Sequence, residues 1–164
     1  MKHPIAQTRN GIPVYVDLIY SRAATNIAQQ PHLLVLLKEL LGQTKIGGSK
    51  LSFDKDMGRS IGNTYIVETS GKDTILYAQR IRDNVYTRFV KNSAPLPTQH
   101  IAVVLNRDDE GNYELQDTWI GRLFPPMPGS SNETTDSKPY WLNHAFVFNG
   151  ESIQTRTITR ECPY

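Results

Sequence analysis

Apolar residues at helical spacing mark one strong helix in the first quarter of the chain. The segment PHLLVLLKELLG places Pro31 at the first helical position and Gly42 just past the end, the usual start and stop signals. Five leucines recur at the spacing of one helix face: Leu33, Leu34, Leu37, Leu40 and Leu41. We predict that this face packs into the core and is not a groove for a partner, because amphipathic helices of small domains bury their apolar side.

Beyond the helix, short runs rich in β-branched and aromatic residues predict strands. The predicted strands are 63–68, 74–79, 85–90, 100–105, 112–119 and 152–159. Turn residues separate them, so SGKD, RIRDN and RDDEG each predict a hairpin turn. Residues 14–19 form either a further short strand or a lead into the helix. The order of elements predicts an α+β fold, an N-terminal helix packed on a mainly antiparallel β-sheet of about five to six strands.

Three segments predict loops. Residues 45–63 are rich in Gly, Ser and Lys and predict a mobile or functional loop. Gly48 and Ser49 stand where a phosphate-binding loop requires Lys and Ser or Thr, so that motif is excluded. The Pro-rich residues 92–98 predict a crossing between strands, and residues 123–138 predict a long lid, binding loop or disordered segment.

Composition limits the class of protein. A length of 164 residues predicts a single domain over 1–164, and 38% hydrophobic with 21% charged residues fits an ordered one. The net charge of +2 gives no global field, so any site for a polyanion must be built locally. The single Cys162 excludes an intramolecular disulfide. No signal sequence and no long apolar run is present, so we expect a cytoplasmic protein without membrane contact.

One of the four histidines stands out as an acid/base candidate. His144 lies between Trp141 and Phe146, and aromatic surroundings can tune the pKa of an imidazole and stack a nucleic-acid base. We therefore predict His144 as a catalytic residue and Trp141 as a substrate-binding residue. The sequence contains no HExxH, CxxC or GxSxG motif, and we expect neither a metal nor a cofactor.

The segment TILYAQRIRDNVYTRFVKN concentrates arginine and tyrosine. Strand alternation puts Tyr86 and Arg88 on one face, with Tyr77 across the hairpin. The planar guanidinium group of arginine can form two parallel hydrogen bonds with phosphate oxygens, and tyrosine rings stack on bases. We therefore predict an anion-binding surface that contains Arg80, Arg82 and Arg88. A polar, solvated sheet face fits the same pattern, and that alternative stays open.

A later strand ends at TWIG and adds two polar candidates. The hydroxyl of Thr118 can donate to a phosphate oxygen, and Arg122 follows closely behind it. The alternative is that Thr118 is simply a residue with high strand propensity that pairs with a residue on the neighbouring strand.

These features together resemble the barnase–EndoU–colicin D–RelE-like group of ribonuclease toxins. The resemblance covers roughly residues 63–148 and consists of a helix followed by an antiparallel sheet, an Arg/Tyr-rich central hairpin, a threonine on a later strand and a histidine near the end. It implies that His144 is the general acid/base, that Arg88 and Arg80 stabilise the phosphate, that Thr118 positions it, and that Tyr86 is a second donor or a stacking platform.

The resemblance implies a metal-independent endoribonuclease toxin that cleaves RNA by acid/base-assisted phosphoryl transfer, with a cognate antitoxin or immunity protein as partner. Tyr77, Arg82, Arg122 and Trp141 are then expected to bind the substrate. The alternative is a non-catalytic protein- or nucleic-acid-binding module of a mobile-element or toxin–immunity system, in which the Arg/Tyr face and loop 123–138 hold the partner. An enzyme acting on a nucleotide ligand is a third possibility.

Overall fold

The computed structural model describes residues 2–47, 51–148 and 155–164. Its contacts divide the chain into two compact units. The first unit comprises Met1–Gly62 and Thr98–Leu123, and the second comprises Asn63–Pro97 and Phe124–Tyr164. Each unit is described by itself below. That residues 1–164 form a single domain stays a prediction.

The first unit is built on a five-stranded sheet with the order β1-β2-β10-β9-β3. Its strands are β1 (Lys2–Gln7), β2 (Pro13–Asp17), β3 (Ser52–Asp56), β9 (His100–Arg107) and β10 (Tyr113–Ile120). Neighbouring strands run antiparallel, except that β2 and β10 are parallel. The predicted turn joins β9 to β10: Asp108 Oδ1 accepts from the backbone N–H of Asn112, and Gly111 takes a φ of 82° that favours glycine.

Two helices complete the first unit, α1 (Arg22–Gln29) and α2 (His32–Gln43). Ser21 caps α1 by accepting from the backbone N–H of Ala23. The apolar face of α2 is buried as predicted, with Leu36 inside and Leu34 only half-buried. The buried leucines Leu33, Leu36, Leu37, Leu40 and Leu41 join Val14, Ile101, Val103 and Leu115 in one core. Burying each leucine contributes about 1.5–3 kcal/mol, which makes this face the main anchor of α2.

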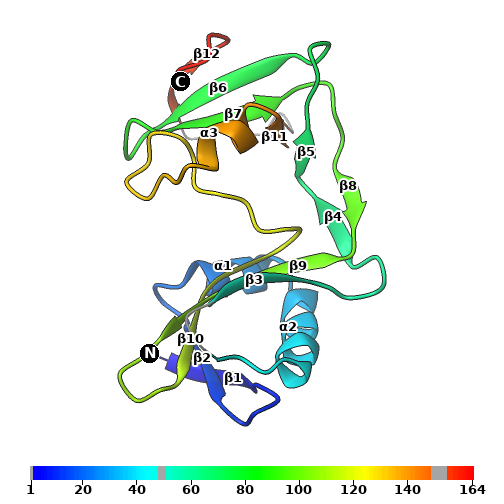
Figure 1. The fold of residues 1–164 in the computed structure, drawn as a ribbon, viewed down its shortest axis with the longest axis vertical. Coiled ribbons are helices and arrows are strands. Elements are labelled where there is room, and N and C mark those ends of the chain that lie inside the picture. Colours follow the sequence, from blue (N-terminus) through cyan, green and yellow to red (C-terminus); the bar gives the residue numbers. More distant parts are fainter. Residues whose placement is uncertain (1, 48–50, 149–154) are drawn as a thin grey trace. The chain divides into compact units, whose positions relative to one another are not determined.

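The second unit is built on another five-stranded sheet, with the order β12-β6-β7-β11-β5. Its strands are β5 (Ile66–Glu68), β6 (Ile75–Arg80), β7 (Tyr86–Val90), β11 (His144–Val147) and β12 (Thr155–Thr159). Neighbours run antiparallel, except that β7 and β11 are parallel. The short helix α3 (Ser137–Trp141) precedes β11 (Figure 1). A small core of Val67, Val90, Ala145 and Val147 lies on one face of the sheet.

The α+β class is confirmed, but the predicted single helix on one sheet is wrong. The described residues form three helices, the two five-stranded sheets and a two-stranded sheet of β4 (Gly62–Thr64) and β8 (Leu96–Thr98) (Figure 1). The helix α1 and strands β1, β3 and β8 were not predicted. The strand β3 lies inside the segment 45–63 expected to be a loop, and β8 lies inside the Pro-rich segment 92–98 expected to be a crossing. Residues 48–50 of that segment and 152–154 of the predicted last strand lie outside the described residues.

The hairpin predicted across SGKD is also wrong. The strand β5 pairs with β11, and β6 pairs with β7 and β12 instead. The other two predicted hairpins, β6–β7 and β9–β10, are confirmed. In the described ranges, no helix is long and apolar enough to cross a membrane.

Candidate functional site

His144 is the first residue of β11 and lies three positions after Trp141, the last residue of α3. Its Nδ1 lies 2.9 Å from the carbonyl oxygen of Tyr140, and its ring stacks on the Tyr140 ring with centroids 3.9 Å apart. A carbonyl only accepts hydrogen bonds, so Nδ1 carries the proton and Nε2 holds the free lone pair of the neutral imidazole. The ring is partly open to solvent, with 24% of the side chain exposed. His144 is therefore held in one tautomer, with Nε2 as its unprotonated nitrogen.

A carboxylate lies beside that nitrogen. The pairing of β11 with β5 sets Glu68 opposite His144, and Glu68 Oε1 lies 3.9 Å from His144 Nε2. Glu68 is 87% exposed, so its attraction to a protonated imidazole is worth at most about 1 kcal/mol. Glu68 is therefore a solvent-screened neighbour of Nε2 and not a buried ion-pair partner.

The strand registers place Arg80 on the same face of the sheet as His144. Phe146 pairs with Phe89 across β11 and β7, and Ala78 pairs with Thr87 across β6 and β7. Paired residues share a face, and so do residues two apart along a strand. The face that carries His144 therefore also carries Phe146, Phe89, Thr87, Ala78 and Arg80, and we call it the His144 face.

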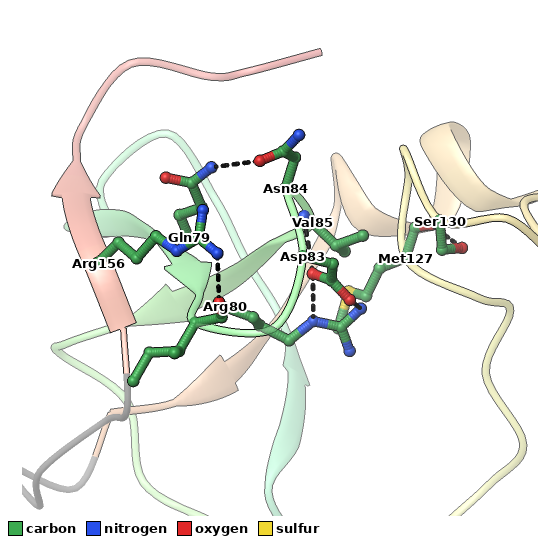
Figure 2. Close-up of polar contacts among 9 residues, drawn as sticks. Gln79, Arg80, Asp83, Asn84, Val85, Met127, Ser130 and Arg156 are labelled. Atoms are coloured by element: carbon green, nitrogen blue, oxygen red, sulfur yellow. Dashed lines mark hydrogen bonds and ion pairs between the residues drawn. The ribbon is translucent and has the colours of Figure 1, made fainter.

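Arg80 is fixed by a carboxylate in the turn that follows β6. Its Nε and Nη2 donate to the two carboxylate oxygens of Asp83, at 3.2 and 2.9 Å (Figure 2). Asp83 also accepts from the backbone N–H of Val85 at 2.9 Å. This backbone bond, with the Arg80 guanidinium after it, lowers the pKa of the Asp83 carboxyl. Arg82, in the same turn, is exposed and forms no hydrogen bond or ion pair with another described residue.

Arg88 lies on the opposite face and is buried. Its Nε donates to the hydroxyl of Tyr77 at 3.2 Å, and its Nη1 donates to Thr69 Oγ1 at 2.8 Å and to the His144 carbonyl oxygen at 2.9 Å. Tyr77 sits directly across the hairpin from Arg88, and burial raises the pKa of its hydroxyl. With only 7% of Arg88 exposed, its guanidinium ties three strands together and contacts His144 through the backbone.

Tyr86 shares the face of Arg88 and lines a cavity of about 350 Å³. The lining residues come from the hairpin, the loop before α3, α3 itself and the C-terminal residues: Asn84, Tyr86, Pro128, Gly129, Glu133, Lys138, Pro163 and Tyr164. Glu133 is held by the backbone N–H of Gly129 at 2.6 Å, while Lys138 is exposed. Burial raises the pKa of the Tyr164 hydroxyl.

Trp141 is a core residue of the second unit. It is fully buried, its ring stacks on Phe146 with centroids 5.5 Å apart, and its Nε1 donates to the carbonyl oxygen of Pro125. Phe124 packs edge-on against the same ring at 5.6 Å. The indole is thus covered on several sides by protein, and its role as a substrate-binding residue stays a prediction.

Thr118 and Arg122 belong to the first unit, whereas the other predicted site residues belong to the second. Thr118 is fully buried, and its hydroxyl donates to the Ala102 carbonyl oxygen at 2.8 Å, within the β9–β10 pairing. Arg122 is exposed, with Nη2 3.3 Å from His100 Nε2. The positioning role of Thr118 stays a prediction, and the described structure gives its hydroxyl a partner inside the sheet.

Two residues near His144 were missed from the sequence, Glu68 and Tyr140. Tyr140 stands four residues before His144, the spacing of neighbours on a helical turn, so its contact was within reach of the sequence. Glu68 is brought in by strand pairing that no local pattern signals. Within the described part of the chain, no group of three or more His, Cys, Asp or Glu residues is placed to hold a metal ion.

Comparisons with known proteins identify no relative: no protein-family model, no curated protein and no solved structure matches this chain.

Proposed function

We propose that the chain is a metal-independent endoribonuclease in which His144 is the general base. The single observation that carries the proposal is the state of His144: Nδ1 is committed to the Tyr140 carbonyl oxygen, which leaves Nε2 unprotonated, in a side chain that is 24% exposed. A base needs a free lone pair within reach of substrate, and this arrangement supplies one without a metal.

The proposed reaction is an internal phosphoryl transfer. Nε2 of His144 takes the proton of a ribose 2′-hydroxyl, the 2′-oxygen attacks the adjacent phosphorus, and the bond to the 5′-oxygen breaks. The leaving 5′-oxygen takes up a proton from solvent, which gives a 2′,3′-cyclic phosphate and a 5′-hydroxyl end. Glu68, 3.9 Å from Nε2, stabilises the imidazolium that forms.

Arg80 is the cation best placed to stabilise the phosphate, because it shares the His144 face and Asp83 holds its guanidinium in place. Tyr140, stacked on the imidazole, orients the ring. Arg88 supports the site from the other face through the His144 carbonyl oxygen. We further propose that the protein acts as a toxin in the cytoplasm and has a cognate antitoxin or immunity protein.

The proposal is tested by incubating the purified protein with total cellular RNA and tRNA, in EDTA, over about pH 5 to 9, where an imidazole titrates. Cleavage that leaves cyclic phosphate ends is the expected result. DNA oligonucleotides of matching sequence must stay intact, because they lack the attacking hydroxyl. RNA that remains uncut over the whole pH range excludes the enzyme.

A second candidate, a non-catalytic binding module, is favoured by the burial of Arg88 and Thr118, whose polar groups are bonded within the fold. In that case the exposed arginines and loop 123–138 hold a protein or nucleic-acid partner. Expression in bacteria separates the two candidates. Cells that express a toxin without its partner grow poorly and give few transformants, whereas cells that express a binding module grow normally.

A further inference from the structure

The turn that joins β6 to β7 gathers three arginines from two neighbouring segments. Arg80 and Arg82 come from the end of β6 and from the turn, and Arg156 comes from β12 beside them. We call Arg80, Arg82 and Arg156 the arginine tip. In Figure 2, Arg156 extends from β12 toward the backbone of the turn, and the guanidinium of Arg80 lies beside Asp83.

Arg156 reaches the turn because β12 carries a bulge. Thr155 pairs with Arg80 and Thr157 pairs with Gln79, so the register skips Arg156. A bulge leaves the extra residue out of the ladder and redirects its side chain. Nη2 of Arg156 donates to the carbonyl oxygen of Ile81, which holds the guanidinium against the turn (Figure 2).

Among the described residues, positive charge is in excess at the arginine tip. Asp83 is the carboxylate that pairs there, through its two bonds to Arg80. The pKa of Asp83 is lowered by the Val85 N–H, by Arg80 and also by Arg156, so Asp83 is ionised at neutral pH. This one carboxylate leaves an excess of positive charge over the described residues of the turn and β12. Arg82 and Arg156 are exposed, and Arg82 has its donors free of other described residues.

The arginine tip lies close to the proposed reaction site. In the β11–β7 register, His144 lies opposite Thr87. In the β7–β6 pairing, Arg80 lies opposite Val85, two residues before Thr87, and β6 is the second strand from β11. Strand spacing and rise then put the backbones of His144 and Arg80 roughly 12 Å apart. One extended strand of RNA therefore reaches both, and Arg80 is common to the two sites.

We propose that the arginine tip is a phosphate-binding subsite for single-stranded RNA, contacting backbone phosphates beyond the linkage that is cleaved. Its main cations are Arg82 and Arg156, which form no salt bridge with a described carboxylate. This inference rests on the proposed function, since it takes RNA as the substrate. Guanidinium groups held in place by Asp83 and by the Ile81 carbonyl keep further donors for phosphate oxygens at little ordering cost. The subsite sets affinity and register without a part in proton transfer.

The test uses the salt dependence of binding. Fluorescence anisotropy of a labelled single-stranded oligouridine is measured against the His144→Ala protein, so that cleavage does not interfere, over a series of KCl concentrations. Each lost phosphate contact makes the slope of log K against log[KCl] less negative by about 0.7. Adding Arg82→Gln and Arg156→Gln together is expected to change the slope by about 1.4, and Arg82→Gln alone by about 0.7.

Lys72→Gln is the matched control, because Lys72 is an exposed cation in the turn before β6, at the other end of that strand. It is expected to leave the slope unchanged. Arg82→Gln alone removes no contact with another described residue, so a folding defect of the double variant does not block the test. An unchanged slope in both arginine variants overturns the inference, as does equal competition by polyglutamate, which points to an acidic protein partner.

The binding assay also separates this inference from the proposed function. If the slopes change as expected but the wild-type protein cuts no RNA, the subsite is supported and the enzyme proposal is refuted. If the wild-type protein cleaves RNA but the slope of log K against log[KCl] does not change in the Arg82 and Arg156 variants, the enzyme proposal is supported and the subsite is refuted.

Discussion

Tyr77→Phe removes a single oxygen from the buried network around Arg88 and tests whether that network holds the second unit together. Tyr77 is 4% exposed, and its hydroxyl accepts from Arg88 Nε at 3.2 Å. Phenylalanine keeps the ring and its edge contact with Tyr164 but leaves a buried charged donor without its acceptor. Such a loss costs about 1–3 kcal/mol, so we expect the free energy of unfolding to fall by about 2 kcal/mol.

Urea unfolding measures this change best in a Trp119→Phe background, where Trp141 is the remaining tryptophan and reports on the second unit. With a typical slope for urea, a loss of 2 kcal/mol lowers the midpoint by about 1 M. Tyr65→Phe is the control, because Tyr65 is 48% exposed in the same unit and its change should stay within about 0.5 kcal/mol. Equal midpoints for Tyr77→Phe and its parent refute a structural role for the Tyr77–Arg88 bond.

Three further predictions concern stability. Trp141→Ala should cost about 3–5 kcal/mol of unfolding free energy by circular dichroism, because a fully buried indole leaves a cavity; a loss confined to RNA binding contradicts its place in the core. Leu37→Ala should cost about 2–5 kcal/mol for the same reason, and a change below 1 kcal/mol contradicts the burial of the α2 leucines. The folded-state pKa of Asp83 is lowered from 3.8, so the stabilisation from this carboxylate is present above pH 3.8 and lost as the pH falls through its folded value. The free energy of unfolding of Asp83→Asn should therefore fall less steeply than that of the wild type as the pH is lowered into the acid range. Equal falls for the two proteins refute the ion pair with Arg80.

Local patterns in the sequence predicted the elements that local physics determines. The leucine spacing of α2 locates its buried face because helical periodicity fixes which side chains point inward. The turn at Asp108–Gly111 selects the β9–β10 hairpin because its side-chain and glycine chemistry favours a tight reversal. The β6–β7 turn likewise placed Tyr77 across the hairpin, but its pairing with Arg88 depends on a register that only the structure supplies.

The pairing of strands that lie far apart in the chain could not be predicted from the sequence. The strand β5 bypasses β6 and pairs with β11, far along the chain, and this pairing sets Glu68 beside His144. Arginine is usually exposed, so nothing local signalled that Arg88 is buried and bonded to Thr69, Tyr77 and the His144 carbonyl oxygen. The Arg156 bulge is likewise a product of the β12–β6 register.

The most direct test of His144 as the general base is the rate of RNA cleavage by His144→Ala relative to wild type, with folding checked by circular dichroism. General base catalysis is worth about 10²–10⁴-fold, so the variant should cleave slower by that factor. His32→Ala is the control, because His32 is an exposed histidine at the start of α2, and its rate should match wild type. A folded His144→Ala protein that cuts RNA at the wild-type rate contradicts the assignment.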